Sequence, residues 1–372
     1  MANEIRTALP LEDLVKHIAR KRKTLLACDF FKESQLDEDD FLEIRRRWNS
    51  HSPVITGGYG GGYYFRWRGK GLVLDPGSTF LQAFQRVDPI AGARAHRMGD
   101  INLVVVTHDH VDHLADLCIL IALLRQYNKH PDRKHKAPHI IDLILSPGAY
   151  ALSQTYLAHP SNLPTVKTAR VLPDRSISQD QDGRDVLEPN QLGIECLSAE
   201  HNEIFGGSTG FGLKITFKHE NGQKIVFCDS GDTAYRADLS AQYANADILL
   251  LHVGTLEDLG KKSPDRGQHL CYQGVVNILD ELNAKGALPK LILLGEWGEE
   301  FASPFFRADF TYHIKEATGL QNHAILPVDL GMKIRLKDGN VYCSDADEYV
   351  PAEQVVVDDS TGQDIQYRKL MS

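Results

Sequence analysis

Short apolar runs alternate along the chain with polar or glycine-rich connections. Two β-rich runs at 63–67 and 72–74 flank a glycine-containing turn, which predicts a hairpin. Helical spacing predicts helices over 114–124 and 272–282. Further strands are predicted over residues 101–106, 140–145, 194–197, 213–217, 225–227, 248–251 and 291–294. Because strands and helices alternate irregularly, with hairpins in both halves, the pattern favours a layered α/β or α+β fold over a doubly wound one.

The first 50 residues have a different pattern of apolar positions. Leu11, Leu14 and Ile18 recur at helical spacing, as do Phe41 and Ile44, and glycine is absent, so helices are predicted throughout this segment. The chain is therefore divided into a helical N-terminal extension (1–52), a central domain (53–336) and a C-terminal extension (337–372). The two extensions would cover an edge of the central domain or form a homodimer.

Composition narrows the class of protein. The 372 residues are 42% hydrophobic and 24% charged, with a net charge of -9, which argues against a surface that coats nucleic acid. The six cysteines form no CxxC pair, so neither a zinc ribbon nor a disulfide framework is indicated. The N-terminus resembles no signal peptide, and no apolar run reaches the roughly 20 residues of a membrane span. These features predict a soluble, cytoplasmic protein without a membrane partner.

The strongest chemical signal is the sequence His-Asp-His-Val-Asp-His at 108–113, directly after a predicted strand. Imidazole and carboxylate groups are ligands for divalent metals such as zinc. Side chains two apart in extended backbone point the same way, so His108 and His110 can hold one ion. Asp112 and His113 can reach a second ion. The alternative is a solvated polar turn with hydrogen-bonded histidines.

Three later segments offer further ligands at strand ends. His201 follows the strand at 194–197, and a structural histidine is its alternative role. Asp232 lies in the acidic turn after the strand at 225–227, where a carboxylate can bridge two cations; the alternative is a purely turn-forming residue. Glu296 follows the strand at 291–294 and is either a ligand or part of a surface loop.

Taken in order, these motifs resemble the metallo-β-lactamase-fold superfamily of metal-dependent hydrolases. The hexapeptide matches the family's HxHxDH motif, and Asp75 in Leu-Asp-Pro-Gly matches the acidic residue that ends the early hairpin. His201 matches the third histidine, and Asp232 in Ser-Gly-Asp-Thr matches the bridging aspartate. The resemblance covers residues 53–336.

The resemblance implies an α+β fold, an αββα sandwich, with a dinuclear zinc site at one edge. His108, His110 and His201 would hold the first ion, Asp112 and His113 the second, and Asp232 would bridge them. Asp75 would steady the site from behind the ligands.

One departure concerns the second ion. The family places a last histidine after the strand at 291–294, where this chain has Gly-Glu-Trp-Gly. Glu296 or His252 would substitute for it, or the second ion would be weakly held or absent. A carboxylate ligand would make manganese or iron plausible beside zinc.

Within the superfamily, the stretch from His201 to the turn at 230–233 is similar to the ribonuclease Z and cyclic-nucleotide phosphodiesterase branch. His269 lies where that branch often has a histidine ahead of a helix. There it would face the substrate phosphate or protonate the leaving group. A core or helix-capping histidine is the alternative.

These assignments predict a hydrolase that uses a metal-activated hydroxide, with two cations about 3.5–4 Å apart. Asp112, with Asp75 behind it, would orient the hydroxide. The favoured substrate is a phosphodiester in a small molecule, a cyclic nucleotide or a nucleic acid. The alternatives are a carboxylic ester, lactone or amide hydrolase, and a metal-stabilised sensor or effector subunit with low turnover.

Overall fold

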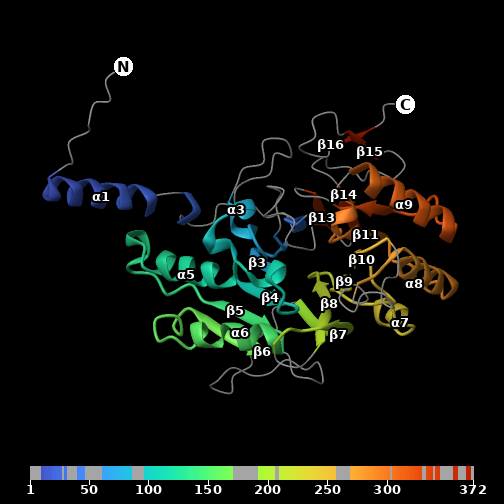
Figure 1. The fold of residues 1–372 in the computed structure, drawn as a ribbon, viewed down its shortest axis with the longest axis horizontal. Helices are drawn as coiled ribbons and strands as arrows, with labels where there is room; N and C mark the ends of the chain where they lie inside the picture. The colour runs from blue at the N-terminus through green and yellow to red at the C-terminus, as the bar shows by residue number, and fades with distance from the viewer. Residues whose placement is uncertain are drawn as a thin grey trace.

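Two mixed β-sheets pack against each other in the computed structural model of the chain (Figure 1). The structure describes residues 10–26, 29–31, 40–46, 61–85, 96–170, 192–205, 209–256, 269–301, 304–328, 332–337, 340–343, 355–358 and 366–369. The sequence also predicts a polar insertion over residues 168–190, and its part from residue 171 onward lies outside these ranges, as do the strand-like residues 54–56 that precede the predicted hairpin.

The first sheet has the strand order β14-β13-β1-β2-β3-β4-β5-β6. The predicted hairpin is the antiparallel pair β2 and β3, and β3 to β6 run parallel. The strands are β1 (Phe41–Ile44), β2 (Tyr63–Trp67), β3 (Lys70–Leu74), β4 (Leu103–Val106), β5 (Ile141–Leu145), β6 (Val166–Arg170), β13 (Lys333–Lys337) and β14 (Asn340–Cys343).

The second sheet has the order β12-β11-β10-β9-β8-β7, with β9 to β12 parallel and β7 to β9 antiparallel. Its strands are β7 (Leu192–Asn202), β8 (Thr209–Lys218), β9 (Lys224–Asp229), β10 (Ile248–His252), β11 (Leu291–Gly295) and β12 (Ile325–Pro327). A separate two-stranded sheet pairs β15 (Val355–Asp358) with β16 (Gln366–Lys369).

Helices cover the outer face of each sheet, α5 and α6 on one side and α7, α8 and α9 on the other (Figure 1). Apolar side chains between the sheets form the inner core, where Phe65 meets Phe227 at a ring-centroid distance of 4.9 Å. The expected αββα sandwich is confirmed. The helices are α1 (Leu11–Leu26), α3 (Phe80–Phe84), α4 (Val111–Leu114), α5 (Leu117–Asn128), α6 (Pro147–Leu157), α7 (Leu239–Tyr243), α8 (Tyr272–Ala284) and α9 (Pro304–Thr318), with 3₁₀ turns η1 (Asp29–Phe31), η2 (Met98–Asp100), η3 (Pro131–Arg133) and η4 (Glu299–Phe301).

The prediction of helices throughout residues 1–50 is wrong at residues 41–44. Residues Phe41–Ile44 form strand β1, which pairs with β2 and β13. Leu42 and Ile44 face the inner core, whereas Phe41 packs in the outer core under the helices. With apolar residues on both faces and only four residues in all, the strand is too short for its pattern to distinguish strand from helix.

The division at residues 52 and 336 stays a prediction, but β1 and β14 both belong to the sheet of the central domain. The predicted homodimer also stays a prediction. Among the described residues, no helix has both the length and the apolar character that crossing a membrane requires.

Strand β1 carries Glu43, which forms a buried charge cluster with Arg45 and His96. The carboxylate of Glu43 lies 2.7 Å from Arg45 Nη2 and 2.5 Å from His96 Nε2. Burial disfavours its charged form, but the nearby Arg45 and His96 outweigh burial and lower the pKa of Glu43 from 4.5 to about 2.

We expect Glu43→Gln to lower the free energy of unfolding by about 3–5 kcal/mol at pH 7, because it leaves Arg45 buried without its carboxylate. Since the folded pKa is depressed, this contribution is present above pH 4.5 and is lost as the pH falls toward 2. Urea unfolding of wild type and variant between pH 7 and pH 3 measures the difference. Glu220→Gln, at an exposed carboxylate 3.5 Å from Arg68, should cost at most about 1 kcal/mol. A wild-type advantage that does not shrink on acidification would contradict the assignment.

Candidate metal centre

The carboxyl ends of parallel strands bring the predicted site residues to one edge of the sandwich. Asp75 and His108 follow β3 and β4 of the first sheet, while Asp232, His252 and Glu296 stand at or just beyond the ends of β9, β10 and β11 of the second. The ends of neighbouring parallel strands meet at the same edge of a sheet, so side chains far apart in the sequence converge there.

Three histidines form the first half of the centre. One ring nitrogen from each of His108, His110 and His201 lies within 4.8 Å of the others. His108 is buried, and its Nε2 has no hydrogen-bond partner among the described residues. Burial and the neighbouring imidazoles hold the pKa of His108 well below its usual value, so its ring is neutral with a free lone pair. A buried nitrogen without a partner is costly, and a metal ion would satisfy it. The residues present therefore fit a metal.

Asp232 lies at the centre of the cluster. Its Oδ2 is 3.7 Å from His108 Nε2, 4.0 Å from His201 Nε2 and 3.5 Å from His113 Nε2. Burial opposes its charge, but the surrounding histidines, His269 foremost, hold the pKa of Asp232 well below its usual value. This position between the two sets of predicted ligands is the one expected of the bridging carboxylate, although the role itself stays a prediction.

The predicted supporting residue, Asp75, orients His113. Its Oδ1 accepts from the Thr107 amide at 2.7 Å, and its Oδ2 accepts from the Thr107 hydroxyl at 2.7 Å. The same Oδ2 lies 2.9 Å from His113 Nδ1. Asp75 thus fixes the ring so that Nε2 points into the centre, which is the arrangement described for carboxylates behind metal-binding histidines.

Sequence reasoning missed Arg46, which was assigned to the helical extension. Its Nη2 lies 2.9 Å from both Asp112 Oδ2 and His113 Nε2, and its Nε lies 2.9 Å from Glu296 Oε1. Asp112 is therefore paired with a guanidinium and belongs to none of the described groups suited to a metal. The only sequence signal was an arginine run after an apolar run, which is ordinary in a surface helix as well.

Both candidates for the missing histidine ligand, Glu296 and His252, reach Asp232. His252 Nδ1 lies 2.9 Å from Asp232 Oδ1 and 3.1 Å from Glu296 Oε2, and its Nε2 lies 2.8 Å from Asp229 Oδ1. Burial opposes protonation, but these carboxylates raise the pKa of His252 well above its usual value. With Asp232 and Glu296, His252 also forms one of the described groups whose ligand atoms lie close enough together to hold a metal ion. Burial raises the pKa of Glu296 to about 7, against the opposing effect of Arg46.

His269 lies at the open side of the cluster. Its Nδ1 is 3.6 Å from Asp232 Oδ2, its ring centroid is 5.0 Å from that of His201, and its side chain is 17% exposed. It does not cap α8, whose N-cap is Cys271. Gly254 makes this position possible, because a Cβ there would lie 2.4 Å from His269 Cβ.

The sequence model of the family described as beta-lactamase superfamily domain matches residues 71–290, more than half of the chain. The chain belongs to this superfamily. No curated protein matches the sequence.

Two solved structures share the fold, and a third aligns over a similar part of the chain. The metallo-beta-lactamase fold protein YhfI from Bacillus subtilis aligns with a TM-score of 0.55 and 15% identity, over 80% of this chain and 99% of that one. Zinc-bound PqqB from Methylobacterium extorquens aligns with a TM-score of 0.50 and 17% identity, over 79% and 99%. The short form of human tRNase Z aligns with a TM-score of 0.49 and 15% identity, over 79% and 98%. At these identities the similarity shows the fold alone.

The classification in the metallo-β-lactamase superfamily of hydrolases is therefore confirmed, and the predicted ligands include buried His/Asp clusters that could hold a metal ion. The substrate, the branch of the superfamily, the identity and number of the ions and the catalytic roles stay predictions. The structure brings together every predicted site residue, and it places Asp112 against Arg46 instead of in a metal-binding group.

Asp109, the remaining acid of the hexapeptide, points away from the histidine cluster's ligand atoms and binds backbone amides after β7. Its carboxylate accepts from the amides of Ile204 and Phe205 at 2.9 and 2.5 Å. These residues follow β7, which carries His201. Asp109 thereby ties the two histidine-bearing segments to each other.

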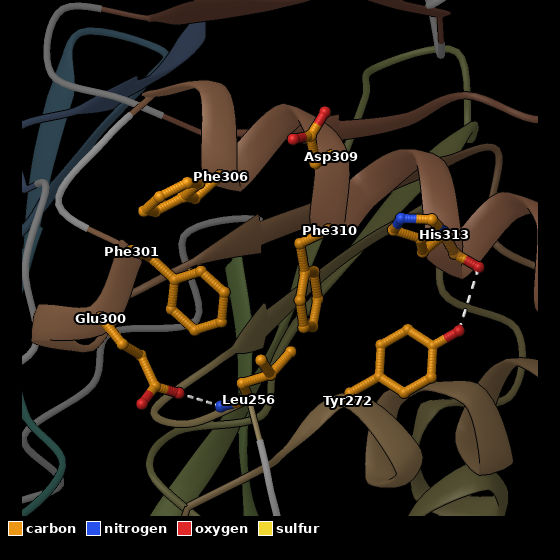
Figure 2. A pocket seen from close by; sticks show the side chains of 8 residues that line it. All are labelled: Leu256, Tyr272, Glu300, Phe301, Phe306, Asp309, Phe310 and His313. Carbon is orange, nitrogen blue, oxygen red and sulfur yellow. Dashed lines mark hydrogen bonds between the residues drawn. The ribbon is translucent and has the colours of Figure 1, made fainter.

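An apolar pocket of about 510 Å³ lies apart from the metal centre (Figure 2). Phe301, Phe306 and Phe310 form its aromatic wall, and Tyr272 closes one side by a 3.1 Å hydrogen bond to the His313 carbonyl. No predicted metal ligand lines this pocket.

Proposed function

We propose that the chain is a zinc-dependent hydrolase that cleaves a phosphodiester bond in a small-molecule or nucleotide substrate. The observation that supports this most directly is the partly exposed His269 beside the buried His/Asp cluster. An alkoxide that leaves a phosphodiester needs a proton, and an imidazole at the open side of a metal centre is placed to donate it. Three imidazoles and one carboxylate favour zinc, with manganese or iron as alternatives.

The residues would divide the work as follows. His108, His110, His201 and Asp232 would hold the ion, which supplies Lewis acidity when bound. Asp232 stays ionised and contributes negative charge at the centre. His269 would meet the substrate and hold the proton destined for the leaving oxygen. Because the rings of His108 and His201 are buried, they are shielded from solvent and held in place.

A substrate panel tests this proposal. Purified zinc-loaded protein would be assayed on bis-p-nitrophenyl phosphate, on cyclic nucleotides, and on lactones, carboxylic esters and thioesters. We expect turnover of the phosphodiesters. Turnover of carbon esters alone would replace the proposal with the ester or lactone hydrolase, and no turnover on the whole panel would replace it with the sensor or effector subunit.

The role of His269 can be tested by the leaving group. We expect His269→Ala to lower kcat on a cyclic nucleotide by about 10²-fold or more, because the ribose oxygen needs a proton. On bis-p-nitrophenyl phosphate, whose p-nitrophenolate leaves without one, we expect a loss below about tenfold. His159→Ala, at an exposed histidine whose ring contacts Ser161, is the control and should change neither rate. Equal losses on the two substrates would show that His269 does not donate the proton.

A further inference from the structure

The second half of the metal centre has the spacing of a cation site. His113 Nε2 lies 3.6 Å from Asp112 Oδ2 and 3.5 Å from both Asp232 Oδ2 and Glu296 Oε2. Donors about 2.0–2.2 Å from one zinc ion stand at similar distances from each other. Among the described residues, His113 and Asp232 form such a group together with His108.

A guanidinium already lies among these atoms. Arg46 Nη2 contacts Asp112 Oδ2 and His113 Nε2 at 2.9 Å, and Nε contacts Glu296 Oε1 at 2.9 Å. The third nitrogen, Nη1, donates to the Gly61 carbonyl at 3.3 Å. The Arg46 side chain is 0% exposed, so its charge is balanced by these partners and not by water. The guanidinium therefore engages side chains of Asp112, His113 and Glu296 that a second ion would need.

The contact with His113 also uses the lone pair that a metal would need. Arginine is only a donor, so His113 Nε2 must accept from Nη2. The ring proton is then on Nδ1, which donates to Asp75 Oδ2 at 2.9 Å. In this arrangement Nε2 is an acceptor already engaged, and Asp112 Oδ2 is occupied by the same guanidinium.

The backbone holds Arg46 in this place. Directly after β1, the Arg45 amide donates to the Gly62 carbonyl at 2.9 Å. Gly61 allows the close approach, because a Cβ on it would lie 2.1 Å from the Arg45 carbonyl oxygen. Since β1 pairs with strands on both sides, Arg46 enters the centre from a fixed point of the sheet.

We infer that the Arg46 guanidinium takes the place of the second metal ion, so that each chain binds one divalent ion. A displaced Arg46 would leave a charge buried without its carboxylates, which strongly disfavours exchange for a metal. A permanent positive charge would then stand beside the single ion, where a second ion stands in two-metal centres. The inference rests on the proposed metal site for its location but not on the proposed reaction.

Metal content tests this inference. The full-length protein would be dialysed against excess zinc, freed of unbound metal and measured by mass spectrometry for zinc per chain. We expect one ion in the wild type and two in Arg46→Ala, because that variant frees Asp112, His113 and Glu296. Arg45→Ala is the matched control: it also removes a buried arginine, one that pairs with Glu43, and it should keep one ion.

The outcomes separate the inference from the proposed function. Two ions in the wild type, or one ion in folded Arg46→Ala, would overturn the inference alone, and one ion without hydrolysis would overturn the function alone. If Arg46→Ala does not fold, Asp112→Asn decides: the inference expects zinc content unchanged from the wild type, whereas loss of an ion would make Asp112 a ligand and overturn it.

Discussion

We expect His201→Ala to abolish both metal binding and hydrolysis. The residue contributes one of the three clustered ring nitrogens, and its ring also contacts His110 and His269. A bound metal supplies several kcal/mol of transition-state stabilisation, and about 1.4 kcal/mol corresponds to a factor of ten in rate. The value of kcat/KM should therefore fall by about 10³-fold or more. Zinc content and phosphodiesterase kinetics of the purified variant measure the two effects.

A different histidine, exposed and remote from the cluster in the sequence, provides the control for this prediction. His159→Ala removes an exposed imidazole and should leave zinc content and kcat/KM at wild-type levels. Near-ultraviolet circular dichroism would establish that His201→Ala is folded. A folded His201→Ala protein that keeps its ion and its activity would exclude His201 from the centre.

The second large effect is expected at Asp75. Its carboxylate accepts from the Thr107 amide, the Thr107 hydroxyl and His113 Nδ1. Asp75→Ala leaves three buried donors unsatisfied at about 1–3 kcal/mol each, so the free energy of unfolding should fall by at least about 3 kcal/mol. Urea unfolding at pH 7 measures this loss.

The isosteric change Asp75→Asn sharpens the prediction. An amide NH₂ in place of Oδ2 would place one donor against another, the Nδ1–H of His113. If the His113 proton moved to Nε2 instead, that N–H would face Arg46 Nη2, which is also only a donor. We therefore expect Asp75→Asn also to be destabilised by more than about 1 kcal/mol. Asp132→Asn, at a side chain that is 79% exposed, should stay within about 0.5 kcal/mol. Wild-type stability of Asp75→Asn would contradict the assigned tautomer.

The central strands were predictable because each is a continuous apolar run with clear ends. Residues Leu291–Gly295 are buried throughout, as expected of a parallel strand covered on both faces. Their helices were predictable for a related reason: α8 repeats its buried positions at helical spacing, and its predicted span of 272–282 matches Tyr272–Ala284.

The predicted ligands that lie close together in the sequence could be identified from the sequence alone. His108, His110 and His113 share one short motif, so their convergence follows from the strand and turn that carry them. His201 and Asp232 were predicted because their motifs follow the hexapeptide in the order typical of the superfamily. That the second sheet brings His201 to within 4.8 Å of His108 and His110, and Asp232 to within 4.8 Å of His108 and His113, was visible only once the strands were paired.

Arg46 could not be predicted from the same reasoning. Its position depends on β1, a four-residue strand whose partners in the sheet are β2 and, nearly 300 residues later in the chain, β13. Burial of an arginine is rare unless carboxylates surround it, and Asp112 and Glu296 come from two other parts of the sequence. Long-range pairing of this kind leaves no local pattern.

The central claim is that His108, His110, His201 and Asp232 hold a metal ion. Anomalous X-ray scattering at the zinc edge, from a crystal of the zinc-loaded protein, tests it most directly. The account predicts a strong peak enclosed by these four side chains, within about 2.0–2.2 Å of their ligand atoms. An empty cluster, with zinc bound elsewhere or not at all, would contradict it.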